Sequence, residues 1–515
     1  MYKQESVTNN SVWVQDDIPT KNNTTSRTMT YFYRILIACA LVSSVCVRFY
    51  QYIFHKDLWL DEAMLTFSIT NISLWDMLSK PLPSLQSAPL GFLLWTRFLY
   101  EFFGAGEYVL YFLPFVCSLG TLLVAYKISQ TFRDNFTQVL FVLLVCGSLG
   151  LLYYATEFKQ YGIEAFCGFL LLYLYIKRIS LRKFLLISGI AVLFSHTIIF
   201  IAIACIMGYT WQSKHNLKAF LKQNTLPILA LGVLFAMYYF LYLKHQSQSG
   251  FYKHFASGFL PHTLGEYPAF FKETLPAIYA GFSPFNDSFV IPFYAIISLL
   301  GFYALYRLHK NLFVFALSSL GIYIALSWLH IYPFGLKGII GGRLSLYMSS
   351  VFFLLCAFGG GVLYNWLKRY SITRVLLMSG VMALTCFTLY QHINQYMKND
   401  HYKAQTHALV RQIAQDSKPD DCVFVFWFAN PALSYYTRLD NLTIPKKQSE
   451  FRHDLATLLE KTKKMVCQRN WVFAASYPTG DWDKQLQDMI YALDKDAKVY
   501  KDKGAILLEF NTQEN

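Results

Sequence analysis

The sequence predicts a polytopic α-helical membrane protein with about eleven membrane segments and a small α/β domain at its C-terminal end. Two features of the composition predict this fold class. Of the 515 residues, 55% are hydrophobic and only 15% are charged, whereas soluble globular chains carry about 25% charged residues. The apolar residues are also concentrated in runs of about 17–25 residues, the length that crosses a bilayer as a helix. The chain therefore lacks the polar side chains needed to cover a water-soluble globule.

The N-terminal end consists of a polar tail and one anchor. Residues 1–30 are rich in Asn, Thr and Ser and show no hydrophobic periodicity, so we expect a disordered cytoplasmic tail. The apolar part of the next segment, Tyr31 to Phe54, is followed by Arg48 and bulky aromatic residues in place of a small-residue cleavage site. This segment is therefore predicted to be an uncleaved anchor and not a signal peptide.

Further apolar segments predict the other spans, and basic clusters indicate their orientation. Cytoplasmic loops carry an excess of Lys and Arg. Residues 184–212 have a basic cluster on both sides, at 177–183 and 214–222, so this stretch has to enter and return as two half-spans that turn at 195–197. The odd total places the N-terminus inside and the C-terminus outside. The expected segments are 31–54, 108–127, 136–153, 157–176, 184–195, 197–212, 224–243, 289–306, 311–329, 343–366 and 375–397.

The basic balance indicates contact with a membrane surface and not with nucleic acid. The chain has 45 Lys and Arg residues against 31 Asp and Glu residues, a net charge of +14. These cations lie in short clusters between apolar runs, as expected for loops that face an anionic leaflet. No nucleic-acid-binding motif accompanies them, so membrane lipids are expected partners and nucleic acid is not.

By this topology, three stretches outside the membrane share the outer face. Residues 55–107 and 244–288 are expected outer loops of a membrane domain that spans 31–397, and residues 401–515 form a separate small domain. This last stretch alternates short apolar runs with helical patterns, which predicts an α/β layer. The expected strands are 423–428, 471–475 and 505–510, and the expected helices are 451–464 and 482–493.

The small C-terminal domain has few features of an independent active site. It shows no paired acids, glycine-rich phosphate loop or metal-ligand spacing, so an accessory role is expected. Of the ten cysteines, only Cys422 and Cys467 lie outside apolar runs, which allows at most one structural disulfide and leaves its formation open. Four aromatic residues are expected to lie mostly in the core: Trp427, Tyr435, Tyr436 and Trp482.

Two adjacent acids, Asp61 and Glu62, follow the first span in an apolar and aromatic setting. Ionisable groups at a membrane boundary are costly to desolvate and are often functional. The alternative is that both acids simply begin a helix, where negative charge is favourable. From position alone, the two interpretations are about equally strong.

Other polar groups are expected at the outer ends of later spans. Glu157 and Tyr161 would share one face of a helix, while Lys159 would align with both only in an extended segment. Arg343 follows two glycines at the start of a span, where a helix N-terminus and a guanidinium favour a phosphate. The alternative for both groups is a snorkelling cation at the interface.

His196 lies at the turn between the half-spans, where a histidine is often only a structural donor. The topology puts it on the same side as the acid pair, Lys159 and Arg343. An acid suited to deprotonating a hydroxyl would then face cations suited to a phosphate, at the depth of the lipid phosphates.

At these residues the sequence resembles the bacterial GT-C membrane glycosyltransferases, in the branch related to protein O-mannosyltransferases and aminoarabinose transferases. The resemblance covers nearly all of the chain and rests on residues 59–63, 86–92, 157–161, 194–196 and 342–343. Lys159 and Tyr111 stand where relatives often carry Arg. The first change keeps the charge without the bidentate fork, and the second removes a cation. The Trp-Trp-x-Asp sequence of oligosaccharyltransferases is absent, which disfavours asparagine glycosylation.

The resemblance implies an inverting glycosyltransferase of the plasma (inner) membrane, with its active site and C-terminal domain on the extracytoplasmic side. It would move a sugar from a polyprenyl-phosphate donor to a hydroxyl group of a glycan, lipid or protein acceptor. Because polyprenyl phosphate leaves as a stable anion, one base and cationic stabilisation suffice. No metal-ligand cluster is visible in the sequence, so we expect metal-independent chemistry without a cofactor.

The resemblance also implies a role for each candidate residue. Asp61 is the expected general base. The acids Glu62 and Glu157 complete the catalytic group. The donor phosphate is expected to bind Lys159, Arg343 and His196, and the substrate is expected to be positioned by Tyr161 and Gln86.

Two other functions stay open at this stage. In a polytopic transporter or lipid flippase, the same charges would line a translocation path. The large outer loops favour an enzyme, and no internal repeat of the kind found in transporters is visible. A polysaccharide polymerase or ligase would instead use a lipid-diphosphate donor.

Overall fold

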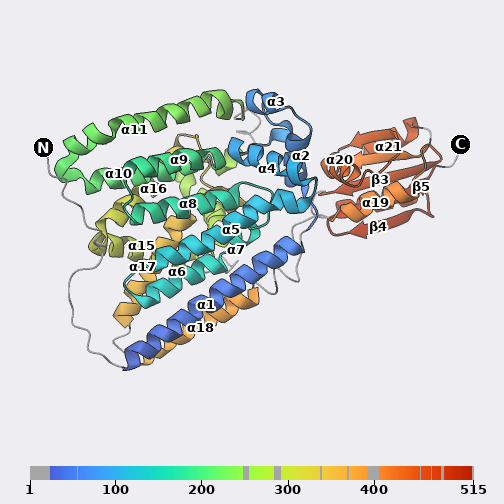
Figure 1. Ribbon diagram of the computed structural model, residues 1–515. Coiled ribbons are helices and arrows are strands. Elements are labelled where there is room, and N and C mark those ends of the chain that lie inside the picture. Colours follow the sequence, from blue (N-terminus) through green and yellow to red (C-terminus); the bar gives the residue numbers. More distant parts are fainter. Residues whose placement is uncertain are drawn as a thin grey trace.

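The computed structural model describes residues 24–54, 56–246, 255–283, 291–336, 339–367, 371–391, 394, 405–452, 454–465, 467–476 and 481–512. They form a helical bundle with a small sheet domain at its C-terminal end (Figure 1). Among them, six helices are long and apolar enough to cross a membrane: Thr30–Ile53, Glu107–Ser129, Lys214–Gln246, Ile291–Leu308, Lys310–Trp328 and Gly342–Leu367. The protein is a multi-pass integral membrane protein, and the expected total of eleven spans stays a prediction.

The bundle is built from long helices that run roughly along one direction and short helices at the end nearest the sheet domain. The long elements and their extensions are α1 (Thr24–Ile53), α5 (Glu107–Ser129), α6 (Asn135–Gly147), α7 (Leu149–Tyr153), α8 (Tyr161–Ile176), α9 (Leu181–Phe194), α10 (Ile198–Gln212), α11 (Leu217–Tyr238), α15 (Ile291–Leu308), α16 (Lys310–Trp328), α17 (Ser349–Leu367) and α18 (Ser371–Gln391). The shorter ones are α2 (Leu60–Thr70), α3 (Leu74–Ser79), α4 (Leu90–Phe103) and α14 (Tyr267–Phe282).

Burial separates the helices that face lipid from those in the core of the bundle. In the most apolar part of Gly342–Leu367, which includes α17, 83% of the residues are buried. In the most apolar part of Lys214–Gln246, which includes α11, only 17% are buried. Leu226 in α11 is 78% exposed, and Phe240, just after the end of α11, is 63% exposed. An apolar surface of this size needs a lipid or protein partner, which agrees with a helix at the outside of a membrane bundle.

Glycines allow α15 and α17 to approach each other closely. A Cβ atom on Gly301 would lie 2.0 Å from the Leu355 carbonyl oxygen, and one on Gly359 would lie 1.9 Å from the Ile297 carbonyl oxygen. Small residues of this kind are the usual contact of membrane helices, because burial of apolar surface adds little within lipid.

Several segments differ from the sequence prediction. The helix α1 begins at Thr24, within the stretch 1–30 that was expected to be disordered, and residues 1–23 lie outside the described part. The expected single span 136–153 is broken at Ser148, whose hydroxyl caps α7 by accepting a hydrogen bond from Leu151 N. The turn expected at 195–197 does separate two helices, α9 and α10, of 14 and 15 residues, and their crossing of the membrane as half-spans stays a prediction.

The C-terminal domain contains a five-stranded sheet with the order β2-β1-β3-β5-β4. Its strands are β1 (Cys422–Phe426), β2 (Lys447–Phe451), β3 (Arg469–Ala475), β4 (Lys498–Asp502) and β5 (Ala505–Asn511). Strands β2, β1 and β3 are parallel, whereas β5 pairs antiparallel with β3 and β4. The helices of the domain are α19 (His407–Asp416), α20 (Asn430–Leu439), α21 (Leu455–Lys464) and α22 (Trp482–Leu493).

The sequence prediction found the central strands of this sheet and missed its edges. Strands β1 and β3 are almost wholly buried, whereas β2 and β4 are largely exposed and polar, so they carry no apolar run. Cys422 and Cys467 form a disulfide with a Cα–Cα distance of 5.9 Å. The aromatic residues Tyr435, Tyr436 and Trp482 are buried as expected, and Trp427 is half-buried.

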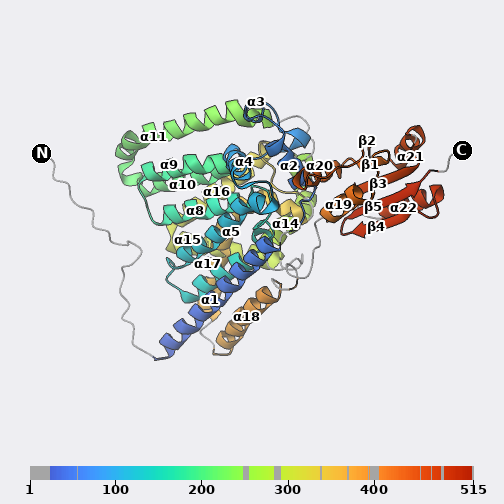
Figure 2. The same cartoon turned by 45° about the vertical axis from the view of Figure 1, so that its right-hand side comes forward.

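The sheet domain contacts the end of the bundle that carries α2. Both views place α20 beside α2, and Figure 2 shows the sheet projecting away from that end. The connection between α10 and α11 lies at the opposite end of the bundle (Figure 1). The loop segments near α2 and the C-terminal domain therefore share one end of the molecule.

Candidate functional site

The two adjacent acids lie in the first turn of α2 and have different surroundings. The Glu62 carboxylate is buried, and it accepts hydrogen bonds from Phe158 N at 2.6 Å and Trp59 N at 3.2 Å. Asp61 instead places Oδ2 3.1 Å from an Arg343 guanidinium nitrogen, with side chains that are 24% and 12% exposed. Both interpretations of the acid pair therefore apply, because Glu62 caps the helix and Asp61 faces a cation.

The segment between α7 and α8 is a bent loop that brings Lys159 to the acids. Lys159 N donates to the Glu157 carbonyl oxygen at 2.7 Å, so the expected helix from residue 157 is wrong, and α8 begins only at Tyr161. The Lys159 ammonium donates to Gln86 Oε1 at 2.6 Å. The Glu157 carboxylate accepts from Trp59 Nε1 at 3.1 Å. The loop thus joins the segments around residues 59 and 86 in one cluster.

The Lys159 side chain is a buried cation. Burial lowers its pKa, because the low-dielectric surroundings disfavour the ammonium form, and the Asp61 carboxylate opposes this by stabilising the charge. The Arg343 guanidinium adds to the lowering of the pKa. Lys159 therefore lies within electrostatic range of both members of the Asp61–Arg343 pair.

Arg343 has hydrogen-bonding capacity beyond its contact with Asp61. It lies in η7 (Ile339–Met348), the tight helical segment before α17, and its guanidinium is 5.6 Å from the centre of the Tyr161 ring. Its Nε atom and the Tyr154 hydroxyl are shielded from solvent and have no hydrogen-bond partner among the described residues. Together with Lys159, these donors could bind an anionic group such as a phosphate.

The glycine before Arg343 serves helix packing. A Cβ atom on Gly342 would lie 2.5 Å from the Ala277 carbonyl oxygen of α14 and 3.4 Å from the Gly281 Cα atom. The missing side chain therefore lets η7 lie against α14. The surroundings of Gly342 therefore favour helix packing over the expected approach of a ligand. This packing also fixes the position of Arg343.

His196 lies apart from this cluster. Its side chain is half-buried, with the ring centre 5.9 Å from that of Tyr238 and 6.2 Å from that of Tyr242. The two tyrosine hydroxyls bind the backbone of Leu90 and Ala88, just after Gln86. In the described part of the chain, His196 makes no hydrogen bond or ring contact with Lys159 or Arg343, and its ring contacts instead support the segment that carries Gln86.

Sequence reasoning assigned no role in the site to two residues that help to build it. Trp59 connects Glu62 and Glu157, as described above, and its position beside the acid pair was the signal available for it. Tyr111, where relatives often carry Arg, is buried, and its hydroxyl lies 3.1 Å from the Lys56 carbonyl oxygen and 3.5 Å from Glu62 Oε2. A hydrogen-bonding aromatic residue thus occupies the place expected for a cation.

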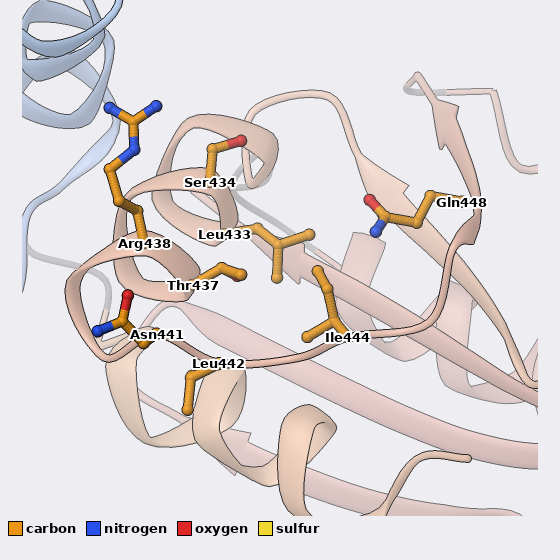
Figure 3. A pocket seen from close by; sticks show the side chains of 8 residues that line it. All are labelled: Leu433, Ser434, Thr437, Arg438, Asn441, Leu442, Ile444 and Gln448. Carbon is orange, nitrogen blue, oxygen red and sulfur yellow. The ribbon is translucent and has the colours of Figure 1, made fainter. Parts of the chain in front are cut away.

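A separate pocket of about 520 Å³ lies in the C-terminal domain between α20 and β2. Figure 3 shows Leu433 and Ile444 facing each other across it, while Arg438 extends toward the membrane domain. Its lining holds one cation and no acid: Leu433, Ser434, Thr437, Arg438, Asn441, Leu442, Ile444 and Gln448. Without a carboxylate base, this pocket does not compete with the Asp61 cluster as a reaction site.

No protein-family model matches the sequence, and no curated protein matches it. The fold, however, resembles solved structures of ArnT from Cupriavidus metallidurans. The apo structure matches with a TM-score of 0.50 and 13% sequence identity over 94% of this chain and 98% of that chain. The structure bound to undecaprenyl phosphate matches with a TM-score of 0.52 and 14% identity over 93% and 98%. The chain has a GT-C fold. The GT-C architecture expected from the sequence motifs is thereby confirmed.

Proposed function

We propose that the protein is an inverting glycosyltransferase that transfers a sugar from a polyprenyl-phosphate donor to an acceptor hydroxyl. The observation that carries this proposal is the contact between Asp61 and Arg343, with Lys159 in electrostatic range. A carboxylate beside two cations supplies a base and a phosphate site. The ArnT neighbour bound to undecaprenyl phosphate supports a donor of this class.

In the proposed reaction, Arg343 and Lys159 hold the donor phosphate and Asp61 accepts the proton of the acceptor hydroxyl. The acceptor oxygen forms a bond to the anomeric carbon as the bond from that carbon to the phosphate oxygen breaks. The electron pair leaves with polyprenyl phosphate, whose charge the two cations stabilise. A phosphate that takes over contacts of Arg343 would also leave Asp61 less stabilised as an anion and therefore more basic.

The remaining candidates have supporting roles in this proposal. Glu62 and Glu157 hold the backbone and Trp59 around the base, and Gln86 orients the Lys159 ammonium. Tyr161 provides the ring under Arg343. His196 acts on the site only through the chain near Gln86.

We also propose that the site faces the extracytoplasmic side of the inner membrane. Helix α8 separates Lys159 from the basic residues after Ile176, and its 16 residues span about 24 Å. The basic turns thus lie at the end remote from the site, as the positive-inside rule requires. The Cys422–Cys467 disulfide supports an oxidising compartment for the domain 401–515, and thus for the outer end of the membrane domain 31–397.

Cysteine labelling tests this orientation. His262→Cys should react with a membrane-impermeant maleimide in intact cells, whereas Arg182→Cys should react only after the cells are opened, because both positions are exposed and the proposed orientation puts them on opposite sides of the membrane. The unmodified protein gives the background from its eight free cysteines. Labelling of Arg182→Cys but not His262→Cys in intact cells would reverse the orientation.

The lowered pKa of Lys159 predicts an alkaline loss of donor binding. Lysine is charged below its pKa, so donor affinity should begin to fall at a lower pH than an ordinary lysine would allow. Lys159→Arg should retain affinity across the same range, because arginine stays protonated. Equilibrium binding of the donor between about pH 7 and pH 10 measures this, and identical profiles for the two proteins would exclude Lys159 as the titrating group.

Reconstitution tests the function itself. The purified protein in liposomes should release polyprenyl phosphate from a polyprenyl-phosphate sugar when an acceptor with a free hydroxyl is present. Exclusive use of polyprenyl-diphosphate sugars would instead favour a polymerase or ligase. Movement of the lipid between leaflets without release of polyprenyl phosphate would favour a flippase.

A further inference from the structure

The segment that carries the proposed base is held by the C-terminal domain as well as by the membrane domain. The Asp57 carboxylate, four residues before Asp61, accepts hydrogen bonds from the backbone nitrogens of Thr406 and His407 at 2.6 and 2.7 Å. One residue later, Leu58 N donates to the Tyr436 hydroxyl at 2.7 Å. Two consecutive residues before α2 are therefore bound by the start of α19 and by α20.

The Tyr436 hydroxyl connects three parts of the fold. It accepts from Leu58 N and donates to Glu107 Oε1 at the first residue of α5. Burial, and then the Glu107 carboxylate, raise the pKa of Tyr436 well above its ordinary value, so the phenol keeps its proton. The Tyr436 side chain is completely buried. It therefore links the C-terminal domain to two different segments of the membrane domain.

Neighbouring contacts hold Tyr436 in place. The His407 ring stacks on its ring at 4.2 Å, and His407 Nε2 lies 2.7 Å from Asp440 Oδ2. Arg411 pairs with the same carboxylate oxygen at 2.5 Å. Farther along α20, Arg438 donates to the Thr70 carbonyl oxygen and to Asn71 at the other end of α2. The domain thus contacts both ends of the helix on which Asp61 lies.

We propose that the C-terminal domain is a positioning element of the reaction site, in which Tyr436 sets the place of Asp61 relative to Arg343. The proposal rests on the glycosyltransferase function proposed above and assigns Tyr436 no contact with substrate. Small displacements of a reacting group cost rate steeply, about a hundredfold for 1 Å. The hydrogen bonds that Asp57 and Leu58 form with the C-terminal domain, called the bridge below, therefore act on the rate of transfer. The cations that bind the donor lie on other segments.

The test compares Tyr436→Phe with Tyr435→Phe. Both remove one hydroxyl from a buried tyrosine of α20, but the Tyr435 hydroxyl has no partner among the described residues. Tyr436→Phe should lower kcat by roughly tenfold to a hundredfold with little change in the donor KM. Tyr435→Phe should leave both constants near those of the unmodified protein. Equal kcat values for the two variants would overturn the proposal.

Hydrogen exchange provides a readout that does not depend on activity. The Leu58 amide should exchange faster in Tyr436→Phe than in Tyr435→Phe, because it loses its acceptor. An unchanged rate at residues 56–62 would overturn the bridge even if the enzyme is active. If the Leu58 amide exchanges faster in Tyr436→Phe but even the unmodified protein transfers no sugar, the result would support the bridge and contradict the proposed function.

A second pair of variants covers the case in which Tyr436→Phe does not fold. Asp57→Asn keeps a side-chain oxygen that can accept from Thr406 N and His407 N, whereas Asp57→Ala keeps none. Asp57→Ala should reproduce the loss of kcat at an unchanged donor KM, and Asp57→Asn should restore most of it. Equal rates in Asp57→Ala and the unmodified protein would overturn the proposal.

Discussion

Asp61→Asn is expected to abolish sugar transfer while donor binding survives. Asparagine has nearly the same shape but does not accept the proton of the acceptor hydroxyl, so the transfer rate should fall by about a hundredfold to ten-thousandfold. Donor affinity should be unchanged or higher, because the neutral amide competes less with the phosphate for Arg343, now 3.1 Å from Asp61. Single-turnover transfer and equilibrium donor binding measure the two effects separately.

Two other substitutions make this result specific. Asp76→Asn removes a half-buried carboxylate of α3 that pairs with Lys80, and it should leave transfer unchanged. Glu62→Gln should mainly lower stability, because Glu62 accepts two backbone hydrogen bonds in a buried position. Transfer that is lost in Glu62→Gln and retained in Asp61→Asn, with both proteins folded, would exchange the roles of the two acids.

Arg343→Ala is expected to have the largest effect on donor affinity. A hydrogen bond to a charged group contributes about 1.5–3 kcal/mol, so the Kd of the donor should rise roughly tenfold to a hundredfold. Arg343→Lys should recover only part of this, because lysine restores the charge without the bidentate fork. Titration of the donor against the purified protein gives the three affinities.

The matched control for Arg343 is Arg97→Ala in α4. Arg97 also pairs with an acid, Glu101 at 2.7 Å, near the same end of the bundle, but it has no part in the cluster around Asp61. Its removal should leave donor affinity unchanged. If Arg343→Ala binds the donor as tightly as Arg97→Ala does, the phosphate site lies elsewhere.

The rarity of charge near apolar segments made most of the candidate site predictable. Asp61, Lys159 and Arg343 stand out because ionisable groups beside membrane spans are costly unless they are paired or used. The role of each acid was not predictable. Asp61 and Glu62 are adjacent and chemically similar, and only their partners, Arg343 for one and the backbone of residues 59 and 158 for the other, separate them.

Elements that lack a local pattern were missed for a related reason. Strands β2 and β4 are at the edges of the sheet, so few of their side chains are buried and no apolar run marks them. The break at Ser148 depends on a hydroxyl that caps α7 and also donates to the Gly281 carbonyl oxygen. An apolar pattern continues through such a break without a visible change.

The sequence alone determined that this chain is a helical membrane protein with an α/β domain, because the length and spacing of apolar runs decide what each segment can bury. The tertiary structure decided which polar groups meet. Arg343 and Asp61 are 282 residues apart in the chain, and Tyr436 and Leu58 are 378 apart. Local periodicity reports only which side of a segment is apolar. The pairing of distant polar groups depends instead on how the whole bundle packs, including the glycine contacts that let η7 approach α14 and thereby place Arg343 opposite the start of α2.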